Sequence, residues 1–258
     1  MRIATWNVNS IRQRLDHVIG YLGTVSPDVL CLQELKCTDE SFPTAEIEAC
    51  GYHCHVHGQK GFNGVAILSK QPLDVVAGLP GEPEDVQARF LEARMLEGAG
   101  ALHIASIYLP NGNPVDTDKY PYKLRFMDRL IAHARQRLAE GATLVLAGDY
   151  NVIPDRRDAA DPDAWVHDAL YLPQTRDRFR TLLSLGLVDA LRTTTDVAGV
   201  YSFWDYQAGA WQRNKGIRID HLLLSSQAAD RLLDVTVDKE MRAADKPSDH
   251  VPVRIDLR

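Results

Sequence analysis

The sequence contains no long hydrophobic run. Nowhere in its 258 residues do about 18 apolar residues follow one another, as a membrane-spanning helix would require. An apolar leader is also missing, because the chain enters a strand-like run at its first residues. Ser/Gly-rich linkers, low-complexity tracts and internal repeats are absent as well. We therefore expect a cytoplasmic protein without membrane association, folded as a single domain over residues 1–258.

Cysteine is scarce, and the net charge has the wrong sign for a simple contact with phosphates. The four cysteines, Cys31, Cys37, Cys50 and Cys54, are expected to be free thiols in a cytoplasmic chain. The net charge of −6 argues against a nucleic-acid partner. The distribution of charge matters more than its sum, however, because a bound metal ion would offset acids gathered around it.

Short apolar runs that end in a polar side chain dominate the sequence. Runs of this length predict strands, and their near-continuous apolar character predicts burial on both faces. They cover residues 3–6, 29–32, 102–107, 144–148 and 217–219. A further strand is predicted at residues 52–57, where alternation places His53, His55 and His57 on one face; this strand is favoured over a zinc site.

Helical periodicity lies between several of these runs. Ser10 is the expected N-cap of a helix whose apolar positions run to Leu22. Longer helical patterns cover residues 119–140 and 175–185, and another follows Ser225 through Leu233. Alternating strands and helices predict an α/β layered fold. The pattern leaves open a doubly wound sheet or two packed sheets with helices outside.

The polar groups at the ends of the runs are the candidate functional residues. Strand ends that each present one polar group suggest a site at one edge of the sheets. Hard oxygen ligands with one imidazole suit Mg²⁺ or Mn²⁺ better than zinc, and several acids fit hydrolysis of a phosphate ester. Each residue alone could be a turn residue, so the inference depends on their recurrence. The set is Asn7, Glu34, Tyr108, Asp149, Asn151, Asp220, Asp249 and His250.

Seven motifs in order along the whole chain resemble the exonuclease III family of AP endonucleases, within the superfamily of metal-dependent endonucleases, exonucleases and phosphatases. They cover residues 5–10, 32–36, 61–69, 108–112, 148–151, 218–221 and 246–250. The resemblance implies an α/β four-layered sandwich of two packed mixed β-sheets flanked by helices. It also implies a Mg²⁺-dependent DNA repair phosphodiesterase, with Mn²⁺ able to substitute. Such an enzyme cuts the backbone 5′ to abasic sites and removes 3′ blocking groups or nucleotides from duplex DNA, here as a monomer.

The resemblance also implies residue roles. Glu34 matches the principal metal ligand. Asp149 matches the acid that activates or orients the attacking water, and Asn151 a neighbour that positions it. Asp220 matches the carboxylate that holds His250, the imidazole that contacts the phosphate. Tyr108 matches a phenol that contacts the phosphate or stabilises the leaving group. The implied metal site comprises Asn7, Glu34, Asp149, Asn151, Asp249 and His250. Asn9 stands where some relatives have aspartate, so the number of metal ions stays open.

Residues 201–219 interleave aromatics with cations, which is typical of a DNA-facing loop or of a surface loop with core aromatics. By resemblance, Phe203, Ile217 and Ile219 wall an apolar slot for an extruded abasic sugar. Asn111 matches an asparagine that contacts the target phosphate. Further candidate phosphate contacts are Lys119, Lys123, Arg125, Arg129, Arg213 and Lys215.

Two other functions remain open. One is a phosphatase or phosphodiesterase of the same superfamily that acts on a non-DNA phosphate ester. Tyr108 counts against it, because several such relatives carry a histidine at that strand end. The other is a non-catalytic nucleic-acid-binding relative, which would be expected to have lost catalytic acids. His167 and the strand of histidines receive no role.

Overall fold

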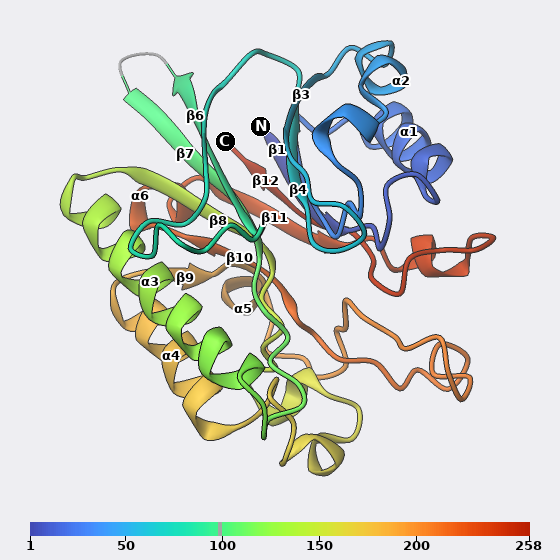
Figure 1. Cartoon of the computed structure of the whole chain (residues 1–258), viewed down its shortest axis with the longest axis vertical. Coiled ribbons are helices and arrows are strands. Elements are labelled where there is room, and N and C mark those ends of the chain that lie inside the picture. Colours follow the sequence, from blue (N-terminus) through green and yellow to red (C-terminus); the bar gives the residue numbers. More distant parts are fainter. Residues whose placement is uncertain (98–99) are drawn as a thin grey trace.

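The apolar runs form two six-stranded mixed sheets that pack face to face, with helices on both outer faces (Figure 1). The computed structural model describes residues 1–97 and 100–258. The first strand shows why layers form. Ile3 faces the core between the sheets, whereas Ala4 and Trp6 face the helical layer. Because side chains alternate along a strand, each sheet needs cover on two faces. The expected four-layered sandwich is confirmed.

The first sheet, sheet A, has the strand order β11-β12-β1-β2-β4-β3, and sheet B has the order β5-β6-β7-β8-β10-β9. The strands of sheet A are β1 (Arg2–Asn7), β2 (Val29–Gln33), β3 (His53–His57), β4 (Val65–Ser69), β11 (Leu232–Val237) and β12 (Val253–Leu257). Those of sheet B are β5 (Asp74–Ala77), β6 (Phe90–Glu97), β7 (Gly100–Tyr108), β8 (Thr143–Asp149), β9 (Val188–Asp189) and β10 (Asp220–Leu224). The strand predicted at residues 52–57 thus forms as β3.

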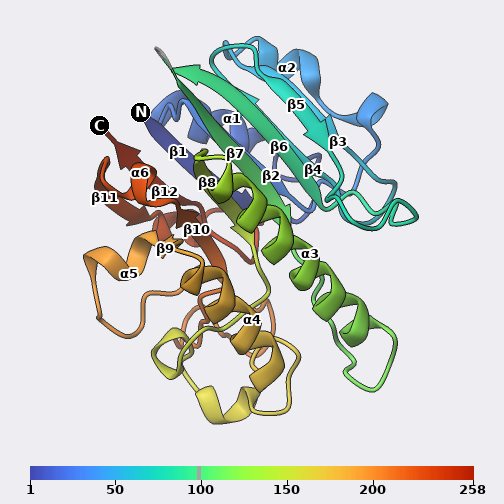
Figure 2. The same ribbon diagram turned by 90° about the vertical axis from the view of Figure 1, so that its left-hand side faces the viewer.

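Helices cover the two outer faces unequally. On the outer face of sheet B lie the two longest helices, α3 (Lys119–Ala139) and α4 (Pro173–Ser184), side by side (Figure 2). Sheet A is covered by α1 (Leu15–Thr24) and α2 (Thr44–Glu48). The remaining short helices are α5 (Ala190–Thr194), α6 (Ser226–Ala229), η1 (Asp39–Ser41), η2 (Arg156–Asp158), η3 (Pro162–Trp165) and η4 (Lys239–Ala243). Within residues 1–97 and 100–258, no helix has the length and apolar character needed to cross a bilayer.

Three predicted boundaries are wrong. Ser10 has φ +90° and is not a cap; α1 begins five residues later, after Arg14. The helix expected through Leu233 stops at Ala229, and the β-branched run that follows pairs with β12 as β11. Within residues 217–219, Ile217 forms two isolated bridges, to Ala159 and Phe203, and the strand begins at Asp220 rather than ending before it.

Strand direction brings the polar run ends to one edge of the sandwich. β1 runs parallel to β2, and β7 runs parallel to β8, so Asn7, Glu34, Tyr108 and Asp149 lie at the same edge. β10 is antiparallel to β8 and pairs Asp220 with Asp149, which brings the start of this strand to the ends of the others. β12 is likewise antiparallel to β1, so the segment that precedes β12 returns to this edge.

Close pairing of β7 with β8 requires a glycine just before the acid of β8. A Cβ on Gly148 would lie 2.0 Å from the main-chain oxygen of Ile107. No side chain fits there, so the glycine allows Asp149 to follow directly at the strand end. The four cysteines are free, as the sequence predicted.

Candidate active site

Asn7 joins acids that come from the two different sheets. Its Nδ2 donates to Glu34 Oε1 at 3.0 Å and to Asp149 Oδ2 at 2.9 Å. The main-chain N–H of Asn9 donates to Asn7 Oδ1 at 3.0 Å, which fixes the orientation of the amide. The amide therefore turns its N–H groups, not its oxygen, toward the acids. This differs from the expectation that Asn7 is a metal ligand.

His250 is held by a buried carboxylate. Its Nδ1 donates to Asp220 Oδ2 at 2.8 Å, and the hydroxyl of Ser202 donates to the same oxygen at 2.6 Å. Burial opposes the charged imidazolium, but the charges of Asp220 and Asp149 outweigh burial and raise the pKa of His250. The second ring nitrogen, Nε2, is thereby left as a charged donor 3.8 Å from Asp149 Oδ2.

Asp149 is almost fully buried and is oriented by two donors. Asn7 donates to Oδ2, and the main-chain N–H of Asn151 donates to Oδ1 at 2.9 Å. Burial raises the pKa of Asp149 well above that of an ordinary aspartate, although the charge of His250 acts in the opposite direction. A carboxylate with a raised pKa is a better proton acceptor near neutral pH.

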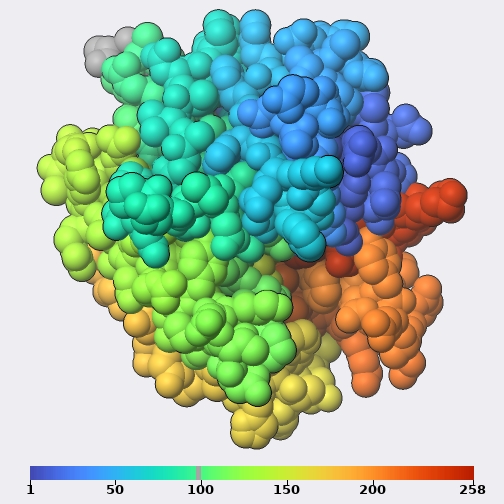
Figure 3. Space-filling model, in the orientation of Figure 1, coloured from blue at the N-terminus to red at the C-terminus, as the bar shows by residue number. Residues whose placement is uncertain are grey.

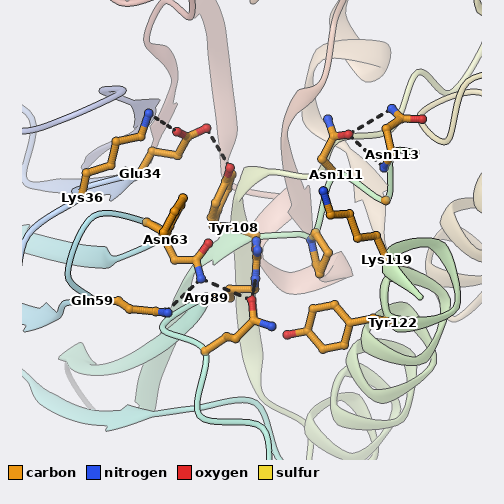
Figure 4. A pocket seen from close by; sticks show the side chains of 14 residues that line it. Glu34, Lys36, Gln59, Asn63, Arg89, Tyr108, Asn111, Asn113, Lys119 and Tyr122 are labelled. Atoms are coloured by element: carbon orange, nitrogen blue, oxygen red, sulfur yellow. Dashed lines mark hydrogen bonds and ion pairs between the residues drawn. The ribbon is translucent and has the colours of Figure 1, made fainter. Parts of the chain in front are cut away.

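Glu34 lies at the centre of a second group, on the side of sheet A. Tyr108 Oη donates to Glu34 Oε1 at 2.8 Å, and Lys36 Nζ lies 2.9 Å from Oε2 (Figure 4). Burial opposes its ionisation, yet the hydrogen bond from Asn7 and the charge of Lys36 outweigh burial and lower the pKa of Glu34. Its φ of +54° is unusual for a residue other than glycine or asparagine. Backbone strain of this kind is concentrated at functional sites.

Asparagine side chains link the loops that follow β7 and β8. Asn111 Nδ2 donates to Asn151 Oδ1 at 3.0 Å, and Asn151 Nδ2 donates to the main-chain oxygen of Leu109 at 2.9 Å. On the opposite side of the site, Asn9 Nδ2 donates to Asp249 Oδ1 at 3.0 Å. The predicted catalytic residues and the remaining predicted metal ligands therefore lie around one site. The catalytic set is Tyr108, Asp149, Asn151, Asp220 and His250.

Two clefts share Glu34, Tyr108, Asn111 and Asn113. The acidic cleft, of about 300 Å³, adds the carboxylates of Asp149, Asp168, Asp205 and Asp249 together with His250. The basic cleft, of about 500 Å³, adds Lys36, Arg89 and Lys119 (Figure 4). In the space-filling view, the surface is hollowed where the blue, green and orange segments meet (Figure 3). Acidic and basic side chains are thus separated into two neighbouring clefts, although the net charge of the molecule is negative.

An apolar wall closes one side of the acidic cleft. Phe203, Ile217 and Ile219 all lie in it, and the Phe203 ring packs 4.9 Å from the His250 ring between centroids. Trp165 and Leu170 complete the wall. Sequence reasoning missed these two residues, because they lie in an irregular segment where no periodicity marks the side chains that face inward.

The expected phosphate contacts do not all face the clefts. Lys119 lines the basic cleft, but Lys123 is 0% exposed, so the expectation that it contacts phosphate is wrong. Arg129 is bonded to Asp85 and to main-chain oxygens of the neighbouring loop. Arg213 and Lys215 are exposed on the loop of residues 205–215, and neither lines a cleft.

Arg125 is exposed and lies 4.0 Å from Glu82, outside the residues that line the clefts. Arg89 was missed by sequence reasoning. Its guanidinium carbon lies 4.8 Å from the centroid of the Tyr108 ring, and Nη1 donates to the main-chain oxygen of Tyr108. Ser202 was also missed. A lone arginine before a strand and a serine in a loop give no sequence signal of such roles.

The acids at this edge could hold a metal ion. Asp149, Asp220 and His250 offer ligand atoms within 4.8 Å of one another. Asp220 and His250 already share a hydrogen bond of 2.8 Å, however, and this pairing suits a proton better than a metal. Glu34, Asp149 and Asp249 instead line the acidic cleft. An oxygen set without thiolates fits a hard cation such as Mg²⁺.

Comparison with known proteins identifies close relatives over the full length. Residues 4–250 match the sequence profile of the Endonuclease/Exonuclease/phosphatase family. The chain is 34% identical over 262 residues to exodeoxyribonuclease III of Haemophilus influenzae, covering 98% of each chain. The solved structure of the 3′ phosphatase NExo from Neisseria, bound to a product DNA hairpin, has a TM-score of 0.96 at 39% identity, covering 100% of this chain and 99% of that one. An AP endonuclease from Archaeoglobus fulgidus has a TM-score of 0.94 at 37% identity, with the same coverage.

Proposed function

The chain belongs to the Endonuclease/Exonuclease/phosphatase family, and on this premise we propose that its acidic cleft hydrolyses phosphodiester bonds of DNA. The family expected from the sequence motifs is thus confirmed. The relatives named above are an exodeoxyribonuclease, a 3′ phosphatase and an AP endonuclease. We assign the same reactions to this chain: cleavage 5′ to an abasic site and removal of 3′ blocking groups or nucleotides.

One observation carries the proposal. A buried acid, a charged imidazole and a phenol from three separate segments face the same cleft beside an apolar wall. These are Asp149, His250 and Tyr108, with Phe203 in the wall. Phosphoryl transfer depends mainly on positioning and on charge stabilisation, and this arrangement provides both.

Each side chain has a distinct proton or charge task. Asp149, oriented by Asn7 and Asn151, accepts the proton of the attacking water at Oδ2. His250, kept charged by Asp220, donates from Nε2 to a phosphate oxygen. Asp149 alone among these acids combines a raised pKa with two fixed hydrogen-bond donors, which supports its role as the base.

Two further groups complete the assignment at the phosphate. Tyr108 Oη, now hydrogen-bonded to Glu34, lies at the boundary of the two clefts and donates to the phosphate or to the leaving oxygen. Asn111 contributes an amide from the adjoining loop.

The donor set supports a magnesium site. Five carboxylates lie in the acidic cleft against one imidazole, an excess of negative charge that would repel a phosphate. Glu34, Asp149 and Asp249 would hold the ion, with Mn²⁺ able to replace Mg²⁺. When bound, a divalent cation offsets these charges and polarises the phosphate oxygens.

The two clefts divide the recognition of the substrate. The wall made by Phe203, Ile217 and Ile219 suits a sugar that has lost its base, because it offers apolar contact without a polar partner for a base. The basic cleft suits a neighbouring phosphate of the same strand, through Arg89 and Lys119. The exposed cations Arg213 and Lys215 would contact duplex DNA outside the clefts.

The wider setting follows from the same proposal. We assign the enzyme to the cytoplasm, which is supported by its four free thiols and by its DNA substrate. We further propose a monomer that acts as one domain over residues 1–258 without a membrane partner. The single domain is supported by the family match, which extends over residues 4–250.

An assay on labelled duplexes tests the function. Three substrates are compared: one with an abasic site, one with a 3′-phosphate and one with an undamaged recessed 3′ end. We expect cleavage in Mg²⁺, no cleavage in EDTA, and recovery on addition of Mg²⁺ or Mn²⁺. The relative rates on the three duplexes define the balance among the three activities.

Three outcomes would contradict the proposal. Full cleavage in EDTA would exclude the metal site. Failure to cut any of the three duplexes, together with hydrolysis of a small phosphate monoester, would favour a phosphatase that acts on a non-DNA ester. DNA binding without any hydrolysis would favour a non-catalytic relative.

A further inference from the structure

Lys123 lies inside the protein, beneath the loops that form the acidic cleft. It belongs to the early part of α3, and its side chain is fully buried. None of the ion pairs found among residues 1–97 and 100–258 includes it. A buried lysine without a paired carboxylate is rare, because burial of an ammonium group is costly. Burial lowers the pKa of this lysine to about 7, opposed by the charges of Asp168 and Asp149.

The nitrogen of Lys123 makes two hydrogen bonds, both to main-chain oxygens of the site loops. Nζ donates to the oxygen of Asn111 at 3.0 Å and to the oxygen of Asn151 at 2.6 Å. Asn111 follows β7, and Asn151 follows β8. The same two residues are also joined through their side chains, at 3.0 Å. The lysine thus connects the two loops through their main chains, and the amides connect them through their side chains.

The loop after β7 lies directly on the stem of this lysine. Gly112 has φ +91°, and a Cβ at this position would lie 2.7 Å from Lys123 Cδ and 3.1 Å from Ala169 Cβ. The main chain at Gly112 can therefore approach the lysine stem closely, which allows Nζ to reach both oxygens. Either an ammonium or a neutral amine has enough N–H groups for these two contacts, so the connection does not depend on titration.

We propose that Lys123 is a positioning residue that clamps the main chains of Asn111 and Asn151, and so holds their side-chain amides in register for the substrate phosphate and the attacking water. The lysine touches neither cleft, so it acts only through these two residues. The effect on catalysis rests on the phosphodiesterase activity proposed above. The clamp itself is a property of the fold and is measurable without substrate.

The first test is kinetic. Lys123→Met retains the length of the stem and removes both hydrogen bonds. We expect kcat to fall about 30-fold with KM changed less than about threefold, because a displaced loop impairs the reacting geometry more than it impairs DNA affinity. Arg135→Met is the matched control, since it removes an exposed cation from the same helix. It should leave both constants within twofold of the wild type.

The second test does not need activity. Hydrogen exchange is measured on peptides that cover residues 108–114 and 149–154 of the metal-free protein. Main-chain N–H groups of Leu109 and Ile153 are hydrogen-bonded there, which gives a protected baseline. In Lys123→Met we expect exchange at least tenfold faster in these two peptides only, and no change in Arg135→Met.

Each outcome has a definite meaning. Unchanged protection in both peptides, or kcat within threefold of the wild type in a folded Lys123→Met protein, would overturn the clamp. Lost protection in a protein whose wild type cuts no DNA would reject the proposed function and leave the clamp standing. If Lys123→Met does not fold, Gly112→Ala disturbs the same contact with the lysine retained. An active Gly112→Ala protein with normal protection would then overturn the proposal.

Discussion

Two buried clusters of charged side chains flank the start of β10, and they differ in how completely their charges are paired. The Asp149 cluster consists of Asp149, Asp220 and His250. The Arg218 cluster consists of Asp158, Asp189, Arg192, Arg218 and His221. Both contain two carboxylates and a histidine, and except for the partly buried Arg192 their members are almost inaccessible to solvent. Residue types alone therefore do not distinguish a reactive site from a structural one.

In the Arg218 cluster, the positive and negative charges are paired. Arg218 Nε donates to Asp158 Oδ1 at 2.7 Å, and Nη2 lies 2.9 Å from Asp189 Oδ2. Arg192 adds a second cation at Asp158. Two guanidinium groups thus meet two carboxylates, and His221 is kept neutral because burial lowers its pKa to about 4. The cavity beside this cluster measures only about 10 Å³.

In the Asp149 cluster, the charges are not fully paired, and the cluster opens to the acidic cleft. Its two carboxylates meet one imidazolium. Among residues 1–97 and 100–258, the buried oxygen Asp220 Oδ1 has no hydrogen-bond partner. Asp149 and His250 both line a space of about 300 Å³. The comparison teaches that a buried charged group is available for chemistry when its partners within the fold are incomplete and substrate can reach it.

The largest expected effect tests the unbalanced cluster. Asp149→Asn should lower turnover about a thousandfold or more, roughly 4 kcal/mol of barrier, because the amide cannot accept the proton of water. DNA binding and the melting temperature should be largely retained. The measurement is steady-state cleavage of an abasic duplex in Mg²⁺, with the exposed Asp163→Asn as control. Activity within tenfold of the wild type would remove Asp149 from the mechanism.

The second prediction tests the balanced cluster. Arg218→Met leaves two carboxylates buried without their main partner, so the free energy of unfolding should fall by about 3 kcal/mol. Denaturant unfolding measures the change. Arg156→Met, which breaks only an exposed pair with Asp163, should leave the free energy of unfolding nearly unchanged. An equal free energy of unfolding in the two variants would show that the Arg218 cluster does not stabilise the folded state.

A smaller effect is expected at the wall of the acidic cleft. Phe203→Ala should reduce cleavage at an abasic site about tenfold more than it reduces removal of a 3′-phosphate, because only the former needs an apolar seat for a sugar without a base. The ratio of kcat/KM on the two duplexes is the readout. The exposed Val197→Ala serves as control. Equal losses on both substrates would argue against the role of the wall.

The smallest effect concerns pH. The pKa of His221 is about 4 in the folded protein and about 6.5 in an unfolded chain, so the unfolded state binds the proton first as the pH falls. Stability should therefore decline between pH 6.5 and pH 4 because of this group. The raised pKa of His250 acts in the opposite sense: its contribution is complete below pH 6.5 and is lost as the pH rises through about 10.

Unfolding of the wild type and of His221→Gln, measured between pH 7 and pH 4, isolates the contribution of His221, because that of His250 is already complete below pH 6.5. The variant should show the shallower decline. Identical slopes in the two proteins would mean that His221 titrates as it would in the unfolded chain.

Much of the candidate site could be predicted from the sequence, because a short apolar run that ends in a polar side chain marks the end of a strand. The runs that end near Asn7, Glu34, Tyr108 and Asp149 gave the layered fold, and the fold confirmed their common edge. Asp220 shows the limit. It was taken to follow a strand but begins one, and it reaches the site only because β10 runs antiparallel to β8.

Residues without a local signal could not be foreseen. Trp165 and Leu170 entered the wall from an irregular segment, and Arg89 reached Tyr108 from the start of a neighbouring strand. Lys123 was expected to contact phosphate, which requires an exposed side chain, but it is fully buried. The position of α3 against the site loops instead encloses it.

The sequence by itself determined the strand and helix types, the oxygen-rich set of side chains and the order of the motifs, because these depend on residue chemistry and on short-range periodicity. Only the tertiary structure decided which charges are paired, which are buried, and which face a cleft. Pairing and burial arise between residues far apart in the chain, as between Asp220 and His250 or Lys123 and Asn151. These contacts separate a reactive acid from a structural one of the same residue type.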